Sequence, residues 1–166
     1  MDINTVTADI LAWSERFVEV PHPALGGWPP CPFARSARLN RTVQVLTGAD
    51  PYFDLKNRSR WGMGSNEVIV YAYDPAEWPY SRFHAAVETA NTEFLLRKDI
   101  LALEDHPDSV EDVNGVVMNQ GQYALVLVQS LSKLNVAAKQ MGAKGFYHNW
   151  PEEYLTGLFK HRVDPR

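Results

Sequence analysis

The single cysteine of this chain, Cys31, lies in the stiff segment WPPCPFAR, residues 28 to 35. A thiol acts as a nucleophile or metal ligand only as the thiolate, and nearby cations such as Arg35 and Arg38 lower the pKa of a thiol. The prolines around the cysteine restrict the backbone, so less entropy is lost when the loop takes up one shape. The segment therefore predicts either a preformed site around a reactive thiol or a rigid lid packed over the core.

His106 is the histidine that we expect to act with Cys31. It lies in LEDHPD, where a predicted strand ends, and Asp105 and Asp108 flank it. A carboxylate beside an imidazole can fix its tautomer or raise its pKa. We therefore predict that Cys31 and His106 form the reactive centre, either as metal ligands or as thiolate and base. The alternative for His106 is an exposed position in a solvated acidic loop.

The other histidines give weaker signals. His148 lies between aromatic residues in FYHNWP, which either line a cofactor or substrate pocket or close the core. His84 and Glu88 are one helical turn apart, a spacing that can chelate a metal, but the same face reads as solvated. His161 is near the end of the last predicted helix, where it interacts favourably with the helix dipole, so we predict a structural role for it.

Charge is distributed unevenly along the chain. Six basic residues lie between positions 35 and 60, and five carboxylates with no Lys or Arg lie between positions 104 and 112. We expect Arg35 and Arg38 to bind a carboxylate or phosphate, because guanidinium groups match such anions with two hydrogen bonds. The acidic block predicts a cation or metal site. The alternative for both blocks is a solvated surface.

The composition limits the class of protein. A chain of 166 residues with 45% hydrophobic content predicts a single domain, with an N-terminal part at 1–66 and a core at 67–166. One cysteine excludes an internal disulfide, fits a reducing compartment and predicts a cytoplasmic protein. No apolar run approaches the roughly 18 residues of a membrane span. A net charge of −4 makes nucleic acid an unlikely partner.

Hydrophobic periodicity predicts a mixed α+β fold. Helical spacing at 5–19 predicts a first helix, and RTVQVLT predicts a short strand followed by a long loop. From residue 67 the pattern is strand 67–74, helix 81–99, strands 100–105 and 123–130, a helix from 130 to 142 and a strand at 144–149. This βαββαβ order predicts a ferredoxin-like sandwich, with a helix and strand added in front and a helix from Pro151 at the end.

The pattern ILAWSERFVEV followed by CPFARSARL, and then by a strand ending in HPD, resembles a group of small bacterial proteins with a Leu-Cys-Pro-Phe-Ala motif. More distantly it is similar to the YqcI/YcgG family, some members of which are haem-dependent enzymes that hydroxylate nitrogen in amino-acid-like substrates. This resemblance implies haem or iron as a cofactor, with His106 or His148 as the axial ligand and Cys31 as a rival. The insert PHPALGGWPP and the lack of a His-Pro-x-Ser-Ser-Arg segment set this sequence apart from the haem-containing members.

We therefore predict a small cytoplasmic enzyme that acts on an amino-acid-like or other anionic small molecule, with oxidative chemistry at haem or another metal as one form of it. The alternative is a non-catalytic domain that binds a small ligand or another protein. RNA binding through the basic block is a third interpretation, which the lack of an aromatic and basic strand consensus disfavours.

Overall fold

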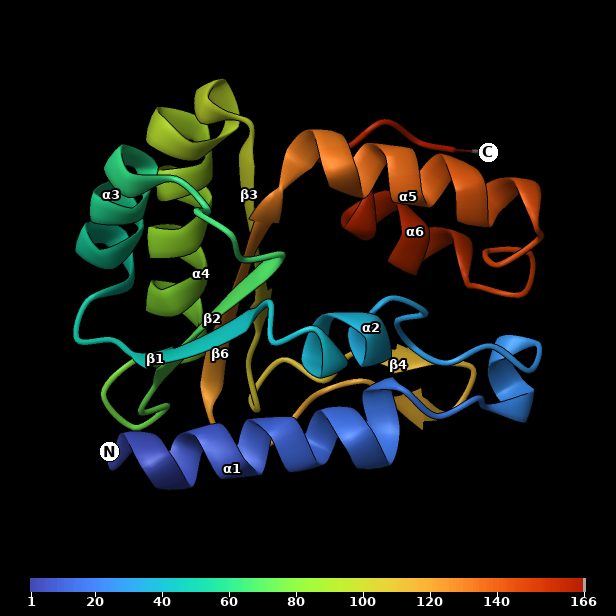
Figure 1. Cartoon of the computed structure of the whole chain (residues 1–166), viewed down its shortest axis with the longest axis horizontal. Coiled ribbons are helices and arrows are strands. Elements are labelled where there is room, and N and C mark those ends of the chain that lie inside the picture. The colour runs from blue at the N-terminus through green and yellow to red at the C-terminus, as the bar shows by residue number, and fades with distance from the viewer. Residues whose placement is uncertain (166) are drawn as a thin grey trace.

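The computed structural model describes residues 1–165 and is built around a four-stranded sheet (Figure 1). The strands are β1 (Val43–Thr47), β2 (Val68–Tyr73), β6 (Ala124–Ser130) and β3 (Ile100–Asp105), in this order across the sheet. β1 runs parallel to β2, whereas β6 is antiparallel to both β2 and β3. β6 is central and apolar on both sides, as expected for a strand that is covered on two faces.

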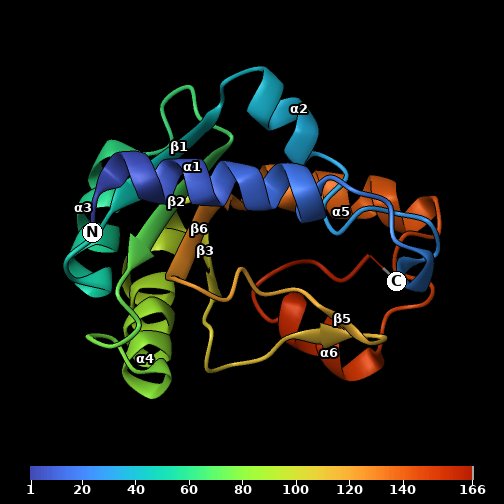
Figure 2. The ribbon, with the colours of Figure 1, turned by 90° about the horizontal axis from the view of Figure 1, so that it is seen from below.

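Helices cover the two faces of this sheet. On one face, α3 (Pro51–Trp61) and α4 (Tyr80–Ala90) enclose a core that includes Leu55, Phe83 and Tyr73. On the other face, α1 (Ile3–Trp13) packs Val6 and Ile10 against the sheet, and Figure 2 shows it lying across the strands. Alternation along each strand divides the side chains between these two cores.

A second group of elements lies at one end of the sheet in both views of the ribbon. It contains α2 (Ala34–Leu39), the short strands β4 (Asp112–Val113) and β5 (Val116–Val117), α5 (Leu131–Ala143) and α6 (Glu152–Leu158). An aromatic cluster forms its core, in which Phe146 contacts Tyr147 and Trp150 with ring centroids 4.8 and 5.3 Å apart. The candidate site lies between this group and the sheet.

Two helices end in irregular turns next to that site. α1 continues as a π-helical turn (Ser14–Val18), and α4 continues as another (Asn91–Leu95), followed by a 3-10 turn (Leu96–Lys98). A further 3-10 turn (Pro23–Leu25) precedes the Cys-Pro segment. π-Helical turns widen a helix locally and occur often at functional sites.

The α+β class is confirmed, but two predicted elements are wrong. Residues 144–149, expected as the last strand, form turns, and the position beside β2 belongs to β1, which lies parallel to it. The expected loop after β1 contains α3, which begins with Asp50 as its N-cap and Pro51 at its first position. The ferredoxin-like description therefore stays a prediction. No helix in residues 1–165 has the length and apolar character to cross a membrane.

Candidate functional site

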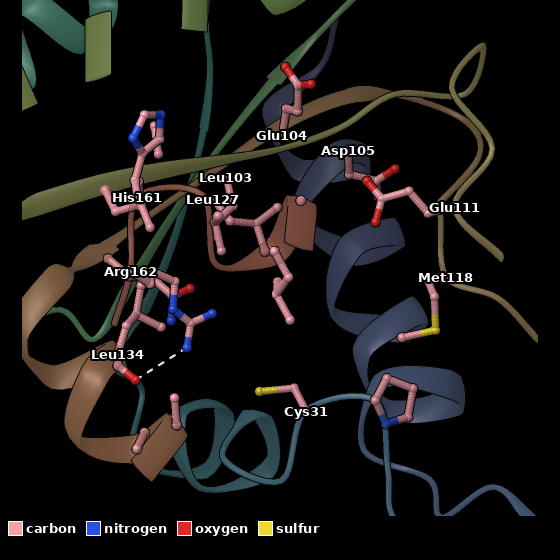
Figure 3. Close-up of a pocket in the computed structure, with 18 of the residues that line it drawn as sticks. Cys31, Leu103, Glu104, Asp105, Glu111, Met118, Leu127, Leu134, His161 and Arg162 are labelled. Atoms are coloured by element: carbon pink, nitrogen blue, oxygen red, sulfur yellow. Dashed lines mark hydrogen bonds between the residues drawn. The ribbon is translucent and has the colours of Figure 1, made fainter. Parts of the chain in front are cut away.

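A cavity of about 750 Å³ lies between the β3 and β6 end of the sheet, α5, α6 and the Cys-Pro segment (Figure 3). Its volume falls within the roughly 300–1,000 Å³ that ligand pockets occupy. Apolar side chains from all of these elements form most of its wall, among them Phe17, Leu103, Leu127, Leu134, Phe146 and Trp150. The cavity therefore suits a molecule with an apolar body.

The alternation of side chains along β3 explains which of its residues face the cavity. Leu101, Leu103 and Asp105 lie on the face opposite Ala102, whose side chain packs with the α4 core. β3 is also an edge strand, and the buried amide of Asn91 covers its free edge. Asn91 donates to the Ala102 carbonyl and accepts from the Ala102 amide, both at 2.9 Å. This side chain satisfies backbone groups that an additional strand would otherwise bond.

Cys31 lines the cavity, as the site interpretation of the Cys-Pro segment requires. The Cys31 amide donates to the Val18 carbonyl at 3.1 Å, which holds the segment on the π-helical turn. Burial raises the pKa of the Cys31 thiol, and the amides of Phe33 and Ala34 only partly offset this effect. Cys31 is therefore a neutral thiol at neutral pH.

The two arginines expected to lower the pKa of that thiol and to bind substrate lie elsewhere. Arg35 is exposed, and neither Arg35 nor Arg38 lines the cavity. Arg38 forms two hydrogen bonds with the carboxylate of Glu19, at 2.7 and 2.9 Å. The expected activation of Cys31 by these residues is wrong, because the first is directed to solvent and the second is neutralised by Glu19.

The arginine that lies near Cys31 is Arg162, from the end of the chain. Its guanidinium points into the cavity near Cys31 (Figure 3), and Nη2 donates to the Leu134 carbonyl at 3.2 Å. The group also lies 4.9 Å from the centroid of the Phe159 ring, and burial lowers its pKa. Sequence reasoning missed Arg162 because only folding brings the end of the chain to the Cys-Pro segment.

Two carboxyl groups line another part of the cavity, buried Asp105 at the end of β3 and half-buried Glu111 in the following segment. Asp105 accepts hydrogen bonds from Asn119 Nδ2 and the Gln120 amide, both at 2.8 Å. Glu111 accepts one from the Tyr154 hydroxyl at 2.8 Å. Burial raises the pKa of both carboxyls, and Asp105 raises that of Glu111 further.

Unpartnered polar atoms are concentrated around this cavity. Four buried side-chain nitrogen or oxygen atoms in residues 1–165 have no hydrogen-bond partner, and three of them belong to lining residues. These are Glu104 Oε2, Trp150 Nε1 and Arg162 Nε; the fourth belongs to His22. These atoms are themselves buried within the wall, so a ligand would reach them only after the wall rearranges.

His106 lies outside this arrangement. It is fully buried, its Nε2 donates to the Trp78 carbonyl at 2.9 Å, and its Nδ1 accepts from the Asp108 amide at 3.1 Å. Both ring nitrogens are therefore engaged in holding the fold, and His106 does not line the cavity with Cys31. This placement supports a structural role.

The residues that would ligate haem do not fit the group. His106 has no free nitrogen, and His148 is exposed and does not line the cavity. Cys31 does line it, but its raised pKa disfavours the thiolate that binds iron. Within the described part of the chain, no group of three or more His, Cys, Asp or Glu side chains is placed to hold a metal ion.

The remaining histidines pair with carboxylates beside the cavity. His84 Nδ1 lies 2.6 Å from Glu104 Oε1, so His84 does not share a metal with Glu88. Glu88 instead contacts His161 Nε2 at 2.6 Å and Lys160 Nζ at 3.1 Å. His161 follows α6, and its contact with Glu88 joins the C-terminal segment to α4. This contact gives His161 a structural role.

Comparisons with known proteins add no relative. No family model, no curated protein and no solved structure matches this chain. The resemblance to the YqcI/YcgG family therefore stays a prediction.

Proposed function

We propose that this protein binds a small molecule with an apolar body and an anionic group in the cavity between the sheet, α5 and α6. The observation that carries this proposal is the guanidinium of Arg162, which points into one largely apolar cavity (Figure 3). An apolar pocket with a few polar groups that fix orientation is the usual form of a small-molecule site.

Arg162 is the residue that we assign to the anionic group. A guanidinium binds carboxylate or phosphate through charge-assisted hydrogen bonds, and Arg162 Nε has no partner in residues 1–165. The carboxylate of an amino-acid-like molecule, the substrate class expected from the sequence, suits this guanidinium.

Two carboxyl groups of the cavity favour an enzyme that acts on this molecule over a protein that only binds it. Asp105 and Glu111 line the same cavity, and groups with a raised pKa in a cleft are candidates for acid and base roles. A non-catalytic binding domain is the alternative. Haem or metal chemistry has no ligand set to support it, and RNA binding through the basic block has no support beyond charge.

The proposal is tested with two probes of nearly the same shape, 3-phenylpropanoate and its neutral amide. Intrinsic tryptophan fluorescence reports binding, because Trp13 and Trp150 line the cavity. A charge-assisted hydrogen bond contributes about 1.5–3 kcal/mol, so we expect the carboxylate to bind at least about tenfold more tightly. Equal affinities would contradict the assignment of Arg162 to an anion.

A cavity-filling variant locates the binding. Leu134→Trp, from α5, occupies space inside the cavity and should abolish binding of 3-phenylpropanoate. Val136→Trp is the matched control, because Val136 is exposed on the same helix and does not line this cavity. Binding that survives in Leu134→Trp would place the ligand elsewhere and refute the proposal.

A further inference from the structure

The strand β1 forms an open edge of the sheet. Figure 1 shows it in front of the other strands, and in residues 1–165 the only strand that pairs with it is β2. Its sequence, VQVLT, has no charged residue and no proline, which are common devices that keep an edge strand from pairing further. The opposite edge is β3, where Asn91 occupies the backbone groups of Ala102. The protein therefore blocks one edge of its sheet and leaves the other open.

The register of β1 with β2 shows which of its backbone groups are used within the sheet. The Thr42 carbonyl accepts from the Val68 amide at 3.2 Å, and the Gly48 amide donates to the Ala72 carbonyl at 3.0 Å. The two strands are parallel and in continuous register between these bonds. Because alternate residues of a parallel strand bond to its neighbour, the even-numbered residues from 42 to 48 are those that bond to β2.

The odd-numbered residues of β1 are Val43, Val45 and Thr47, and they direct their amides and carbonyls toward the open edge. In the described part of the chain, none of these groups has a hydrogen-bond partner. The side chains of Val43 and Val45 pack against the core under α1 and are only partly buried, and Thr47 is exposed. The open edge thus offers three donors and three acceptors in one row.

This row is complementary to itself. When two copies of β1 run antiparallel about a twofold axis at Val45, Val45 lies opposite Val45 of the second copy and Val43 lies opposite its Thr47. Each such pair exchanges two hydrogen bonds, so the three pairs use every free donor and acceptor of both strands. No group of either edge is left without a partner.

The charges at the two ends of β1 favour the same direction of pairing. Exposed Arg41 precedes the strand, and Asp50 follows it and caps α3 with Oδ1. Antiparallel pairing brings Arg41 of each copy toward Asp50 of the other. Parallel pairing would bring like charges together, which destabilises a strand pair.

We propose that β1 is a dimerisation surface, at which two copies of this chain join their sheets by antiparallel pairing centred on Val45. A closed pair that uses the same surface on both subunits is the commonest symmetric assembly of soluble proteins. No residue of β1 lines the cavity that contains Arg162. Dimerisation and the proposed ligand binding are therefore tested independently.

Sedimentation equilibrium of the unmodified chain is the first test. The mass should rise from 18.8 kDa toward twice that value as the protein concentration increases. We expect dimers to predominate at about 1 mM protein, which corresponds to a dissociation constant of about 0.3 mM or less. A chain that stays monomeric up to about 1 mM overturns the proposal.

Val45→Pro locates the interface. It removes the central free amide, and proline is accepted in an edge strand where the amide is not used within the sheet. The variant should remain monomeric, whereas Val45→Thr keeps the amide and should dimerise as the unmodified chain does. By NMR at about 1 mM, the amides of Val43 and Thr47 should exchange hydrogen at least about threefold more slowly in the unmodified chain than in Val45→Pro.

Charge variants provide a second test that does not depend on how well Val45→Pro folds. Arg41→Asp replaces the attraction to Asp50 by repulsion, and aspartate tolerates the left-handed backbone at this position, where φ is 57°. It should raise the dissociation constant of the dimer about threefold or more. Arg97→Asp makes the same charge change before β3, at the other edge, and should leave the constant unchanged.

A dimer that persists unchanged in both Val45→Pro and Arg41→Asp would show that the copies meet at another surface. Exchange of the Val43 and Thr47 amides that is equally fast in the dimer and in monomeric Val45→Pro would show the same. Either result refutes pairing through β1.

Discussion

Replacing Arg162 by Met should separate binding from folding. The substitution removes the only guanidinium assigned to the ligand, and a charge-assisted hydrogen bond contributes about 1.5–3 kcal/mol. At about 1.4 kcal/mol for each factor of ten, we expect the affinity for 3-phenylpropanoate to fall roughly 10- to 100-fold. Met retains an unbranched side chain that fills most of the same space.

The folded state should tolerate this substitution. Arg162 loses its hydrogen bond to the Leu134 carbonyl, its contact with the Phe159 ring and its interaction with the Tyr147 hydroxyl. Against this loss, the buried Nε without a partner disappears, and such a group costs about 1–3 kcal/mol. The two effects nearly cancel, so the melting temperature should change by no more than about 2–4 °C, the shift produced by 1 kcal/mol in a chain of this size.

Arg38→Met is the matched control and should give the opposite pattern. Arg38 lies outside the cavity and neutralises Glu19, whose side chain is only 5% exposed. The variant should therefore melt at a lower temperature but bind the probe with unchanged affinity. The hydrogen bond from Arg38 lowers the pKa of Glu19, so the stability that this pair contributes is present at neutral pH and is lost as the pH falls through that lowered pKa. The difference in melting temperature between the two proteins should begin to shrink as the pH falls below about 4.3, the ordinary pKa of a glutamate.

Fluorescence titration and thermal melting of the three proteins decide the question. Weaker binding in Arg38→Met with normal binding in Arg162→Met would refute the assignment and restore the arginine predicted from the sequence. A loss of binding in Arg162→Met that accompanies a large drop in melting temperature would attribute the effect to unfolding instead.

Three further predictions concern single residues. Asn91→Leu should lower the free energy of unfolding in urea by about 2–4 kcal/mol, because the Ala102 amide and carbonyl both lose their partner; a change below about 0.5 kcal/mol would contradict this. Gly48→Ala should destabilise by about 1–3 kcal/mol, since the new Cβ overlaps the Tyr73 ring, and a variant as stable as the wild type in the same urea assay would be inconsistent with that overlap. Because burial raises its pKa, Cys31 should react with iodoacetamide at pH 7.5 far more slowly than a free thiol; mass spectrometry measures this, and equal rates would show an activated thiol.

Strong hydrophobic patterns made most of the fold predictable. β3 has the predicted bounds, β2 is one residue shorter than predicted at each end, and β6 begins one residue later than predicted. α3 was missed because it is polar around most of its surface and buries only Pro51 and Leu55. The strand expected at 144–149 reflected the β propensity of Phe146 and Tyr147, but these rings pack among the aromatic residues that follow them. Tertiary packing outweighed local propensity there.

The candidate site was predictable only where a local motif marked it. The proline-rich frame of Cys31 identified one wall of the cavity from the sequence alone. The other polar groups come from the end of the chain and from the loop after β3, and no local pattern shows that Arg162 and Glu111 meet Cys31 at one cavity. His106 was expected at the reactive centre with Cys31 or, as the alternative, exposed in an acidic loop, but its buried ring packs against Tyr80 and Phe83 and does not line the cavity.

The most direct test of the central claim is methyl NMR of the leucines with and without 3-phenylpropanoate. Leu103, Leu127 and Leu134 line the cavity, whereas Leu55 and Leu95 lie in the core on the other face of the sheet. If the account is right, saturating probe shifts the first three and leaves the last two unchanged. Shifts confined to other parts of the chain, or none at millimolar probe, would show that this cavity does not bind an anionic small molecule.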